Sequence, residues 1–288
     1  ADKFNTLQMG MVAAKRVFEI LDSDHYINDK GNISIKDLDG DIKFENVDFS
    51  YVKENKVLRN ININIKKGEK VAIVGATGSG KSTIIKLILR LYDLQSGEIK
   101  INNKNIKNYK LSDLRSSISL VNQDIFLFAD SIFKNITLFN EKISKKEVEK
   151  AARNIGVFEF IKKLPDGFDY NVKERGVMLS EGQRQIISFL RAYVSKPNIL
   201  ILDEATSSID SKTEELIQFA TNKIIQDKTS IIIAHRLSTI ISADKIVVMK
   251  AGKIMEIGSH NELITRNGYY KKLYEVQFER KELFAEIF

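Results

Sequence analysis

Hydrophobic and polar positions alternate along this chain with two different periods. In residues 4–21 the apolar positions recur three and four residues apart, which predicts a helix with one apolar stripe. Residues 22–40 are polar and predict a linker. From Ile42 onward the apolar positions recur at every second residue, and the alternation shifts by one residue near Asn46. The shift predicts a bulge or a turn near Asn46, and residues 61–65 predict a second strand with one polar face.

The rest of the chain alternates between short apolar runs and longer amphipathic segments. Short β-branched runs bounded by turn residues predict strands, and stripes with a period near 3.6 predict helices. The predicted strands are residues 71–74, 98–101, 118–121, 199–202, 230–234, 245–249 and 253–257; the predicted helices are residues 82–91, 130–163, 181–194 and 212–226. Because strands that alternate with helices build α/β folds, we expect a largely parallel sheet.

The composition sets limits on the chemistry. The chain has 288 residues and no cysteine, which excludes a disulfide framework, a thiolate metal site and a cysteine nucleophile. Imidazole chemistry is limited to His25, His235 and His260. The longest unbroken apolar run, residues 125–129, is five residues long, whereas a membrane span needs about 18. We therefore expect the chain as given to be soluble.

The net charge of +7 raises the question of a nucleic-acid or membrane partner. Most lysines occur as scattered pairs among acidic residues, whereas a nucleic-acid reader usually clusters its positive charge. We therefore interpret most of them as a solvated face and expect no nucleic acid. The densest basic cluster has no assigned role; it consists of Lys100, Lys104, Lys107, Lys110 and Arg115.

A glycine-rich loop carries the clearest chemical signal. Residues 71–83 read Val-Ala-Ile-Val-Gly-Ala-Thr-Gly-Ser-Gly-Lys-Ser-Thr, which is a strand, the spacing G-x-x-x-x-G-K-[ST] and a helix start. We call residues 75–82 the phosphate loop, because its glycines let the backbone aim N–H groups at a polyphosphate. Lys81 is expected to reach the β- and γ-phosphates, and the Ser82 hydroxyl is expected to ligate Mg²⁺.

Polar residues also follow three other predicted strands. Asp203 and Glu204 end one strand, His235 ends the next, and Gln123 follows a third. Because ligands of open α/β sheets bind at the C-terminal ends of the strands, we expect these side chains near the phosphates. Asp203 would hold Mg²⁺, Glu204 would polarise the attacking water, and His235 would contact the γ-phosphate. The Gln123 amide would ligate Mg²⁺ and sense the same water.

Three helix starts carry capping boxes, in which a serine and a residue three positions later satisfy each other's backbone N–H groups. The boxes begin at Ser144, Ser180 and Ser259. The third box gives His260 an ordinary place in a first helical turn. Spacing alone gives the box at Ser180 no function beyond a well-capped helix.

These motifs together resemble the nucleotide-binding domain of ABC transporters of the exporter type, over residues 40–278. Residues 179–183, Leu-Ser-Glu-Gly-Gln, are similar to the family signature Leu-Ser-Gly-Gly-Gln. In that family the signature closes over ATP bound to the phosphate loop, or Walker A motif, of a second domain. The resemblance therefore implies a head-to-tail partner, either identical or homologous.

The resemblance also implies roles for single residues. Asp203 is similar to the Walker B acid, Glu204 to the catalytic base, Gln123 to the Q-loop residue and His235 to the switch histidine. Tyr51 is similar to the aromatic residue that stacks on adenine; residues 207–210 resemble the D-loop and residues 174–176 the X-loop, which contacts transmembrane domains in exporters. The implied ATP ligands are Tyr51, Gly75, Thr77, Gly78, Ser79, Gly80, Lys81, Ser82 and Thr83, with Ser180, Gly182 and Gln183 serving the partner's ATP. The implied metal ligands are Ser82, Gln123 and Asp203.

For the fold, the resemblance implies a P-loop NTPase core, an N-terminal antiparallel β subdomain and an inserted helical subdomain at about residues 124–184. It makes residues 1–39 the end of a transmembrane helix plus a linker, residues 40–288 the nucleotide-binding domain, and about 266–288 a helical extension. The implied place is the cytoplasmic face of the cell membrane, with the transmembrane domain in the same longer polypeptide. The start at Ala rather than Met is expected of a fragment.

Two departures from the family pattern leave alternatives. Glu181 stands where the family has glycine, and its carboxylate would either repel the partner's γ-phosphate or favour the helix dipole while facing solvent. Ser208 and Ile209 replace Ala and Leu in the D-loop and leave Asp210 intact. Two other functions stay open at this point: a soluble ABC ATPase acting on nucleic acid or ribosomes, and a regulatory nucleotide-binding subunit without turnover.

Overall fold

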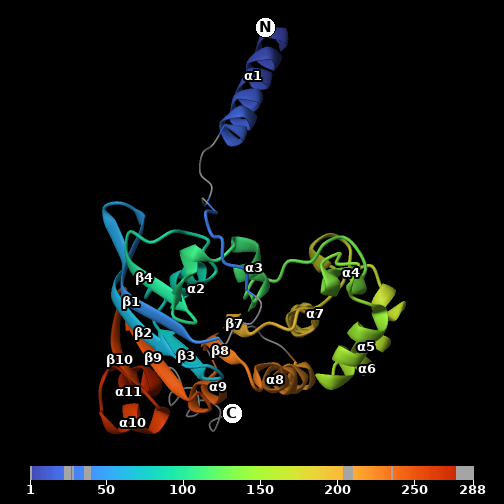
Figure 1. Ribbon diagram of the computed structural model, residues 1–288. Coiled ribbons are helices and arrows are strands. Elements are labelled where there is room, and N and C mark those ends of the chain that lie inside the picture. Colours follow the sequence, from blue (N-terminus) through green and yellow to red (C-terminus); the bar gives the residue numbers. More distant parts are fainter. Residues whose placement is uncertain are drawn as a thin grey trace.

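The computed structural model describes residues 2–22, 27, 29–35, 40–203, 210–234 and 236–276. A four-stranded antiparallel sheet, in the order β2-β1-β4-β5, is built mainly from the first strands of the body (Figure 1). Its strands are β1 Ile42–Val52, β2 Asn55–Ile65, β4 Ser96–Ile101 and β5 Lys104–Asn105. Asn46 has φ 49° at a register shift in β1, so the predicted bulge is confirmed.

A six-stranded sheet in the order β10-β9-β3-β8-β7-β6 forms the centre of the molecule. Its strands are β3 Lys70–Gly75, β6 Ile118–Val121, β7 Ile199–Asp203, β8 Thr229–Ile233, β9 Lys245–Lys250 and β10 Lys253–Gly258. The five strands from β9 to β6 run parallel, and β10 pairs antiparallel with β9. The expectation of a largely parallel sheet is therefore confirmed.

Alternate residues of the central strands face two separate hydrophobic cores, because successive side chains of a strand point to opposite faces. Val71 and Ile73 belong to the core beneath the antiparallel sheet, and Ala72 and Val74 to the core on the other face. The helices that supply these cores are α2 Lys81–Ile88, α3 Leu111–Ser116, α7 Glu181–Val194, α8 Ser211–Ile225, α9 Leu237–Ile241, α10 His260–Thr265 and α11 Tyr269–Tyr274. Both faces of the sheet are covered, as its unbroken apolar strands require.

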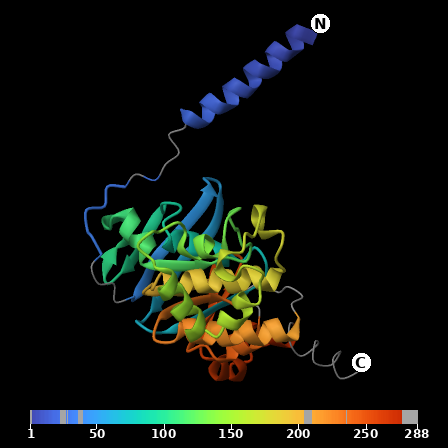
Figure 2. The same ribbon diagram turned by 90° about the vertical axis from the view of Figure 1, so that its right-hand side faces the viewer.

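Residues 130–163, predicted to be helical, form three short helices: α4 Ile132–Thr137, α5 Lys145–Asn154 and α6 Phe158–Lys162. Leu138 ends α4 in the left-handed conformation, with φ 49°, and Gly156, with φ 78°, separates α5 from α6. The apolar stripe of residues 130–163 is therefore divided among three helices, of which α4 and α5 lie beside α7 and α6 lies beside α5 (Figures 1 and 2). Short 3₁₀ turns, η1 Ile106–Asn108, η2 Gly167–Asp169 and η3 Glu174–Gly176, complete the connections.

The N-terminal helix α1, Asp2–Leu21, has no buried residue and projects from the body (Figure 2). Within the part of the chain that the structure describes, no helix combines the length and apolarity that a membrane crossing requires. The described part of the predicted linker is docked on the body. Asp113 accepts hydrogen bonds from the Ser34 hydroxyl (2.6 Å) and the Ile35 N–H (3.2 Å), and these bonds lower the pKa of its carboxyl group.

Candidate functional site

The phosphate loop joins the end of β3 to the start of α2, and glycine is required at two of its positions. At Gly75, with φ 153°, a Cβ atom would collide with the Met249 carbonyl oxygen. At Gly80, with φ 104°, a Cβ atom would lie 2.6 Å from Leu58 Cδ2. Gly80 is the N-cap of α2 and provides no side-chain hydrogen bond to the helix. This helix end is therefore available to an external acceptor.

The Lys81 ammonium lies over the phosphate loop. Its Nζ donates hydrogen bonds to the carbonyl oxygens of Gly75 (2.8 Å) and Ala76 (3.1 Å), and the residue is only 9% exposed. Burial lowers the pKa of Lys81, and the nearby charge of Asp203 opposes part of that shift. The loop therefore holds a desolvated cation whose hydrogen-bond partners are neutral carbonyl groups.

A cavity of about 460 Å³ opens over the phosphate loop. This volume falls in the usual range for small-molecule sites. Its walls combine the loop with the C-terminal ends of three neighbouring strands; they are formed by Val57, Thr77, Gly78, Gly80, Lys81, Ser82, Thr83, Gln123, Asp203 and Ile233. The structure thus brings Lys81, Gln123 and Asp203, which are far apart in the sequence, to one side of the sheet.

Three of the residues in this wall offer oxygen ligands: the Ser82 hydroxyl, the Gln123 amide and the Asp203 carboxylate. Oxygen donors suit Mg²⁺, which usually takes one or two protein carboxylates and fills its other positions with water and substrate phosphate. Among the residues with described positions, no group of three or more His, Cys, Asp or Glu side chains is arranged around a metal position. The donor set therefore fits Mg²⁺ bound together with a phosphate.

Tyr51 stands beside the cavity without forming its wall. Its hydroxyl lies 3.2 Å from the Thr83 hydroxyl, and its ring is 43% exposed. The ring meets Phe49 and Tyr92 edge to face, with centroids 4.9 and 5.0 Å away. The Lys86 Nζ lies 5.4 Å from the centroid of the same ring. An exposed aromatic ring held by its neighbours suits stacking on a planar base.

Several predicted site residues lie outside the described part of the chain. Glu204, residues 207–209 of the D-loop and His235 belong to this group. Asp210, the last D-loop residue, is described and caps α8 by accepting a hydrogen bond from the Thr213 N–H (3.0 Å). Hydrogen bonds from Thr213 hold the pKa of the Asp210 carboxyl below its usual value.

The signature residues are at the start of α7, and none of them contributes to the described wall of the phosphate-loop cavity. The predicted capping box is confirmed: the Ser180 hydroxyl accepts from the Gln183 N–H (3.3 Å), and the Gln183 amide oxygen accepts from the Ser180 N–H (3.0 Å). Ser180 and Glu181 are exposed, and Gly182 is buried. The carboxylate of Glu181 thus lies in an exposed first turn, where its negative charge interacts favourably with the positive end of the helix dipole.

Comparison with known proteins identifies the family. The model of the family described as ABC transporter matches residues 58–207, about half of the chain. This chain belongs to the ABC transporter family. The match includes the phosphate loop, Gln123, the signature and Asp203, and it implies that the cavity over the loop is a nucleotide site.

Relatives within the ABC transporter family extend the likeness to nearly the whole chain. An ATP-dependent lipid A-core flippase of Pectobacterium atrosepticum is 45% identical over 273 residues, covering 94% of this chain and 47% of the relative. A probable multidrug resistance ABC transporter ATP-binding/permease protein of Bacillus subtilis, YheH, is 42% identical over 284 residues, covering 99% of this chain and 42% of the relative. The chain thus spans about half the length of these curated relatives.

A solved structure is also similar to this chain over nearly its whole length. The structure of a bacterial Atm1-family ABC exporter with ATP bound superposes with a TM-score of 0.84 at 36% identity, covering 96% of this chain and 48% of that one. This similarity confirms the predicted α/β fold with its antiparallel β subdomain and helices.

Sequence reasoning missed the residues that hold the phosphate loop from behind. The Gly252 N–H donates to the Ser79 carbonyl oxygen (3.1 Å), and the Arg59 N–H donates to the Gly252 carbonyl oxygen (2.8 Å). Gly252, with φ 76°, was visible in the sequence only as part of a turn between two strands. Its contact with the loop depends on how the turn between β9 and β10 meets β2 and the phosphate loop, which no local pattern encodes.

Proposed function

We propose that this chain is the nucleotide-binding domain of an ABC exporter, which binds ATP with Mg²⁺ and hydrolyses it to drive export across a membrane. The observation that carries the proposal is the position of Lys81. Its buried ammonium faces a cavity of nucleotide size together with Gln123 and Asp203, and its hydrogen-bond partners are neutral. A γ-phosphate would supply the negative charge that this cation lacks.

The phosphates would bind at the open start of α2. Loop N–H groups and the helix dipole favour an anion there, and Lys81 would exchange its bonds to backbone carbonyls for bonds to phosphate oxygens. The Ser79 hydroxyl is 3% exposed and has no hydrogen-bond partner in the described structure, so it is free to bond to a ligand. Tyr51 would stack on adenine beside the loop.

Hydrolysis would use the residues that follow the central strands. Glu204 follows Asp203 at the end of β7 and would act as the general base that takes a proton from the attacking water. His235 follows the end of β8 by two residues and would donate a hydrogen bond to the γ-phosphate. Ser82, Gln123 and Asp203 would hold Mg²⁺, which would supply positive charge to the phosphates.

A second nucleotide-binding domain would complete each site. The exposed Ser180 lies at the start of α7, apart from its own chain's cavity, and its hydroxyl hydrogen is not used in the capping box. It can therefore donate to a phosphate bound by another chain. Gly182 and Gln183 would bind the same ATP, in the head-to-tail arrangement that the family resemblance implies.

An exposed apolar surface supports a transmembrane partner. Phe126, Phe128 and Phe139 are 55%, 43% and 49% exposed, and their rings meet edge to face at 5.1 and 5.6 Å. Leu138 is 51% exposed beside them in the sequence. Exposed apolar patches of this kind mark interaction sites. We propose that this aromatic surface, together with residues 174–176, contacts the transmembrane domain.

The basic cluster, which the sequence left without a role, is partly engaged within the fold. Lys100 forms ion pairs with Glu45 (2.6 Å) and Glu98 (3.7 Å). Arg115 donates to the carbonyl oxygens of Leu89 (3.2 Å) and Arg90 (2.9 Å), at the end of α2. Two members of the cluster are thus engaged within the fold.

The substitution Glu204→Gln tests the proposed reaction. It removes the base and keeps the shape, so ATP turnover should fall about 100-fold or more while ATP binding persists. The variant should also form an ATP-dependent dimer, measured by size-exclusion chromatography with light scattering. Glu215→Gln, an exposed carboxylate on α8, is the matched control and should leave turnover unchanged. Normal turnover in Glu204→Gln would remove Glu204 from the mechanism.

A further inference from the structure

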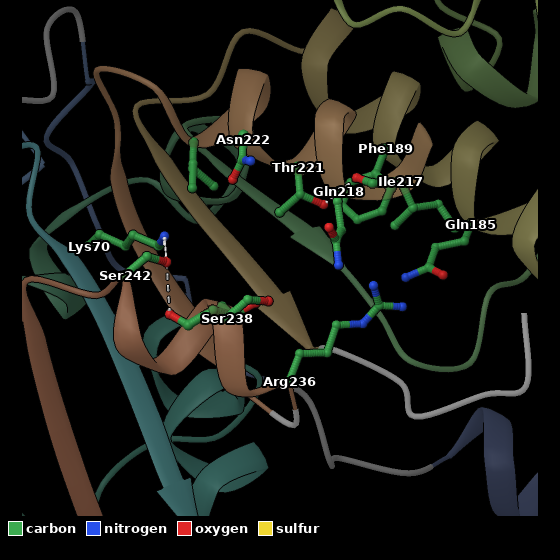
Figure 3. A pocket seen from close by; sticks show the side chains of 12 residues that line it. Lys70, Gln185, Phe189, Ile217, Gln218, Thr221, Asn222, Arg236, Ser238 and Ser242 are labelled. Atoms are coloured by element: carbon green, nitrogen blue, oxygen red, sulfur yellow. Dashed lines mark hydrogen bonds between the residues drawn. The ribbon is translucent and has the colours of Figure 1, made fainter. Parts of the chain in front are cut away.

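A second cavity lies between α7, α8 and α9 (Figure 3), and none of its described lining residues also lines the nucleotide cavity. We call it the three-helix cleft. Its volume is about 220 Å³, below the usual range for drug-sized ligands, so only a small molecule fits. The described residues that line the cleft, none of which carries a carboxylate, are Lys70, Gln185, Phe189, Ile217, Gln218, Thr221, Asn222, Ile225, Arg236, Ser238, Thr239 and Ser242.

Gln185 is the most informative residue of the three-helix cleft. It is only 7% exposed, and its side chain extends into the cleft toward Arg236 (Figure 3). No hydrogen bond joins its amide to another described residue, and the amide atoms are open to the cleft rather than sealed in the core. An amide that faces a cavity and has no described protein partner is available to bond to a molecule held in that cavity.

Two cations and further amides complete the polar wall. The Arg236 side chain is 16% exposed and uses Nη1 in an ion pair with Glu214 (3.2 Å), which leaves other guanidinium N–H groups available. The Lys70 Nζ donates to the Ser242 hydroxyl (2.7 Å). Gln218 and Asn222 on α8 contribute amides at the outer part of the wall. The described wall therefore carries two cations and three amides, all of which can donate hydrogen bonds.

We propose that the three-helix cleft binds a small molecule that carries an oxyanion group, either a carboxylate or a phosphate. Guanidinium and amide N–H groups match such oxygens, and charged acceptors form the stronger hydrogen bonds. Phe189 and Ile217 provide an apolar wall for the remainder of the ligand. The ligand would bond to the Gln185 amide, which has no hydrogen-bond partner within the described ranges of the chain.

The position of the cleft gives this ligand a regulatory effect, and this part of the inference rests on the proposed function. Each lining helix begins at a motif of the nucleotide site: α7 at Ser180 of the signature, α8 at Asp210 of the D-loop and α9 one residue after Arg236, which follows His235. A molecule bound to all three helices would hold them in one arrangement. We expect it to slow any turnover step that requires their relative movement.

Binding is tested first, without ATP, by calorimetric titration of malonate and of inorganic phosphate into this chain. The Lys81→Ala background removes phosphate binding at the nucleotide site. Thr221→Trp should fill the cleft and abolish binding, and Gln218→Leu should weaken it about tenfold. Gln226→Leu, an exposed glutamine at the end of α8 outside the cleft, is the matched control and should leave binding unchanged. Circular dichroism checks the folding of each variant.

The outcomes separate the sources of the ligand and the two parts of the proposal. Binding of malonate alone would assign a carboxylate ligand, and binding of phosphate alone would assign a phosphate ligand. Failure of both probes to bind, or equal binding to Gln218→Leu and Gln226→Leu, would overturn the site. A saturating probe should reduce ATP turnover about threefold or more in the wild-type chain and leave Thr221→Trp unaffected. Binding without this change would overturn the regulatory role, whereas a chain without any turnover would contradict the proposed function instead.

Discussion

The two helix starts that serve the nucleotide site, those of α2 and α7, are built in opposite ways. The start of α2 is capped by Gly80, which has no side chain to satisfy the first N–H groups. The start of α7 is closed by its own residues, because Ser180 and Gln183 exchange hydrogen bonds in a capping box. One helix therefore leaves its donors to a ligand, and the other uses them internally.

The difference indicates how each helix start can contribute to ATP. An uncapped end beside a buried lysine is an anion site within one chain, and it needs a ligand to become fully satisfied. A capped end is stable without a ligand and can present only its exposed surface, here Ser180 and the first turn. We therefore assign α2 to binding ATP within the chain and α7 to closing over the ATP of a partner.

Lys81→Ala should have the largest effect, because it removes the buried cation from the open helix start. ATP affinity should fall about 100-fold or more, since truncating one member of a buried charge pair costs about 2–5 kcal/mol. Isothermal titration with ATP measures this loss, and Lys104→Ala, on the exposed strand β5, is the control. The melting temperature should not fall, since the substitution also removes a desolvated charge. Unchanged ATP affinity would contradict the assignment of the uncapped start of α2 to ATP binding.

Ser180→Ala should separate the two roles of the closed helix start. Loss of a serine cap costs about 1 kcal/mol of unfolding free energy. ATP turnover at concentrations that favour dimers should fall about tenfold, while ATP binding to the monomer stays normal. Both quantities follow from denaturant titration and from assays of released phosphate.

Ser144→Ala is the matched control for the closed helix start, because Ser144 forms the same capping box at α5. It should destabilise the chain by a similar amount without lowering turnover per folded molecule. If the two variants lose turnover equally, the effect of Ser180 is only a matter of stability, and α7 has no role at a partner's ATP.

Tyr51→Ala tests whether the site beside the start of α2 also binds the adenine base of ATP. Base stacking on an aromatic ring is worth about 1–3 kcal/mol, so ATP affinity should fall about tenfold. Tyr51→Phe keeps the ring and removes only the contact with the Thr83 hydroxyl, so it should bind ATP nearly normally. A similar loss of affinity for inorganic triphosphate would show that Tyr51 acts through the loop rather than through adenine.

The pH dependence should give the smallest effect. Burial lowers the pKa of Lys81 in the folded chain below 10.5, so the unfolded chain binds more protons between the two pKa values. The contribution of Lys81 to the free energy of unfolding therefore rises with pH in that interval. Urea titrations across the alkaline range should show this rise in the difference between the wild type and Lys81→Met. A difference that falls with pH would mean that the ammonium is stabilised by its surroundings.

Local patterns predicted most of the elements of this fold. The strands of the central sheet, the bulge at Asn46 and the three capping boxes were all visible in the sequence, because each depends on residues within a few positions of one another. The segment 130–163 was predicted less well. Its division into three helices follows from left-handed residues such as Leu138, a conformation that leucine seldom signals.

The candidate site likewise has features that local patterns predicted and features that they did not. The glycine spacing alone predicted a phosphate loop, and apolar strands ending in Asp203 and Gln123 predicted which sheet edge they share. Two kinds of contact were not predictable. One is the hydrogen bond from Gly252 to Ser79 that supports the phosphate loop, and the other is the docking of residues 29–35 near Asp113. They join segments that are distant in the sequence and have no periodic pattern.

By itself the sequence determined the elements, the phosphate loop and the family resemblance, because turns, caps and strand periodicity are short-range properties of the backbone. Only the tertiary structure decided which side chains share a cavity. It brought Gln123 and Asp203 to Lys81 in the nucleotide cavity and left Ser180 outside the described wall of that cavity. It also placed the Gln185 side chain in the wall of the three-helix cleft. These relations depend on how parallel strands align and how helices pack over them, and packing joins residues without regard to their distance along the chain.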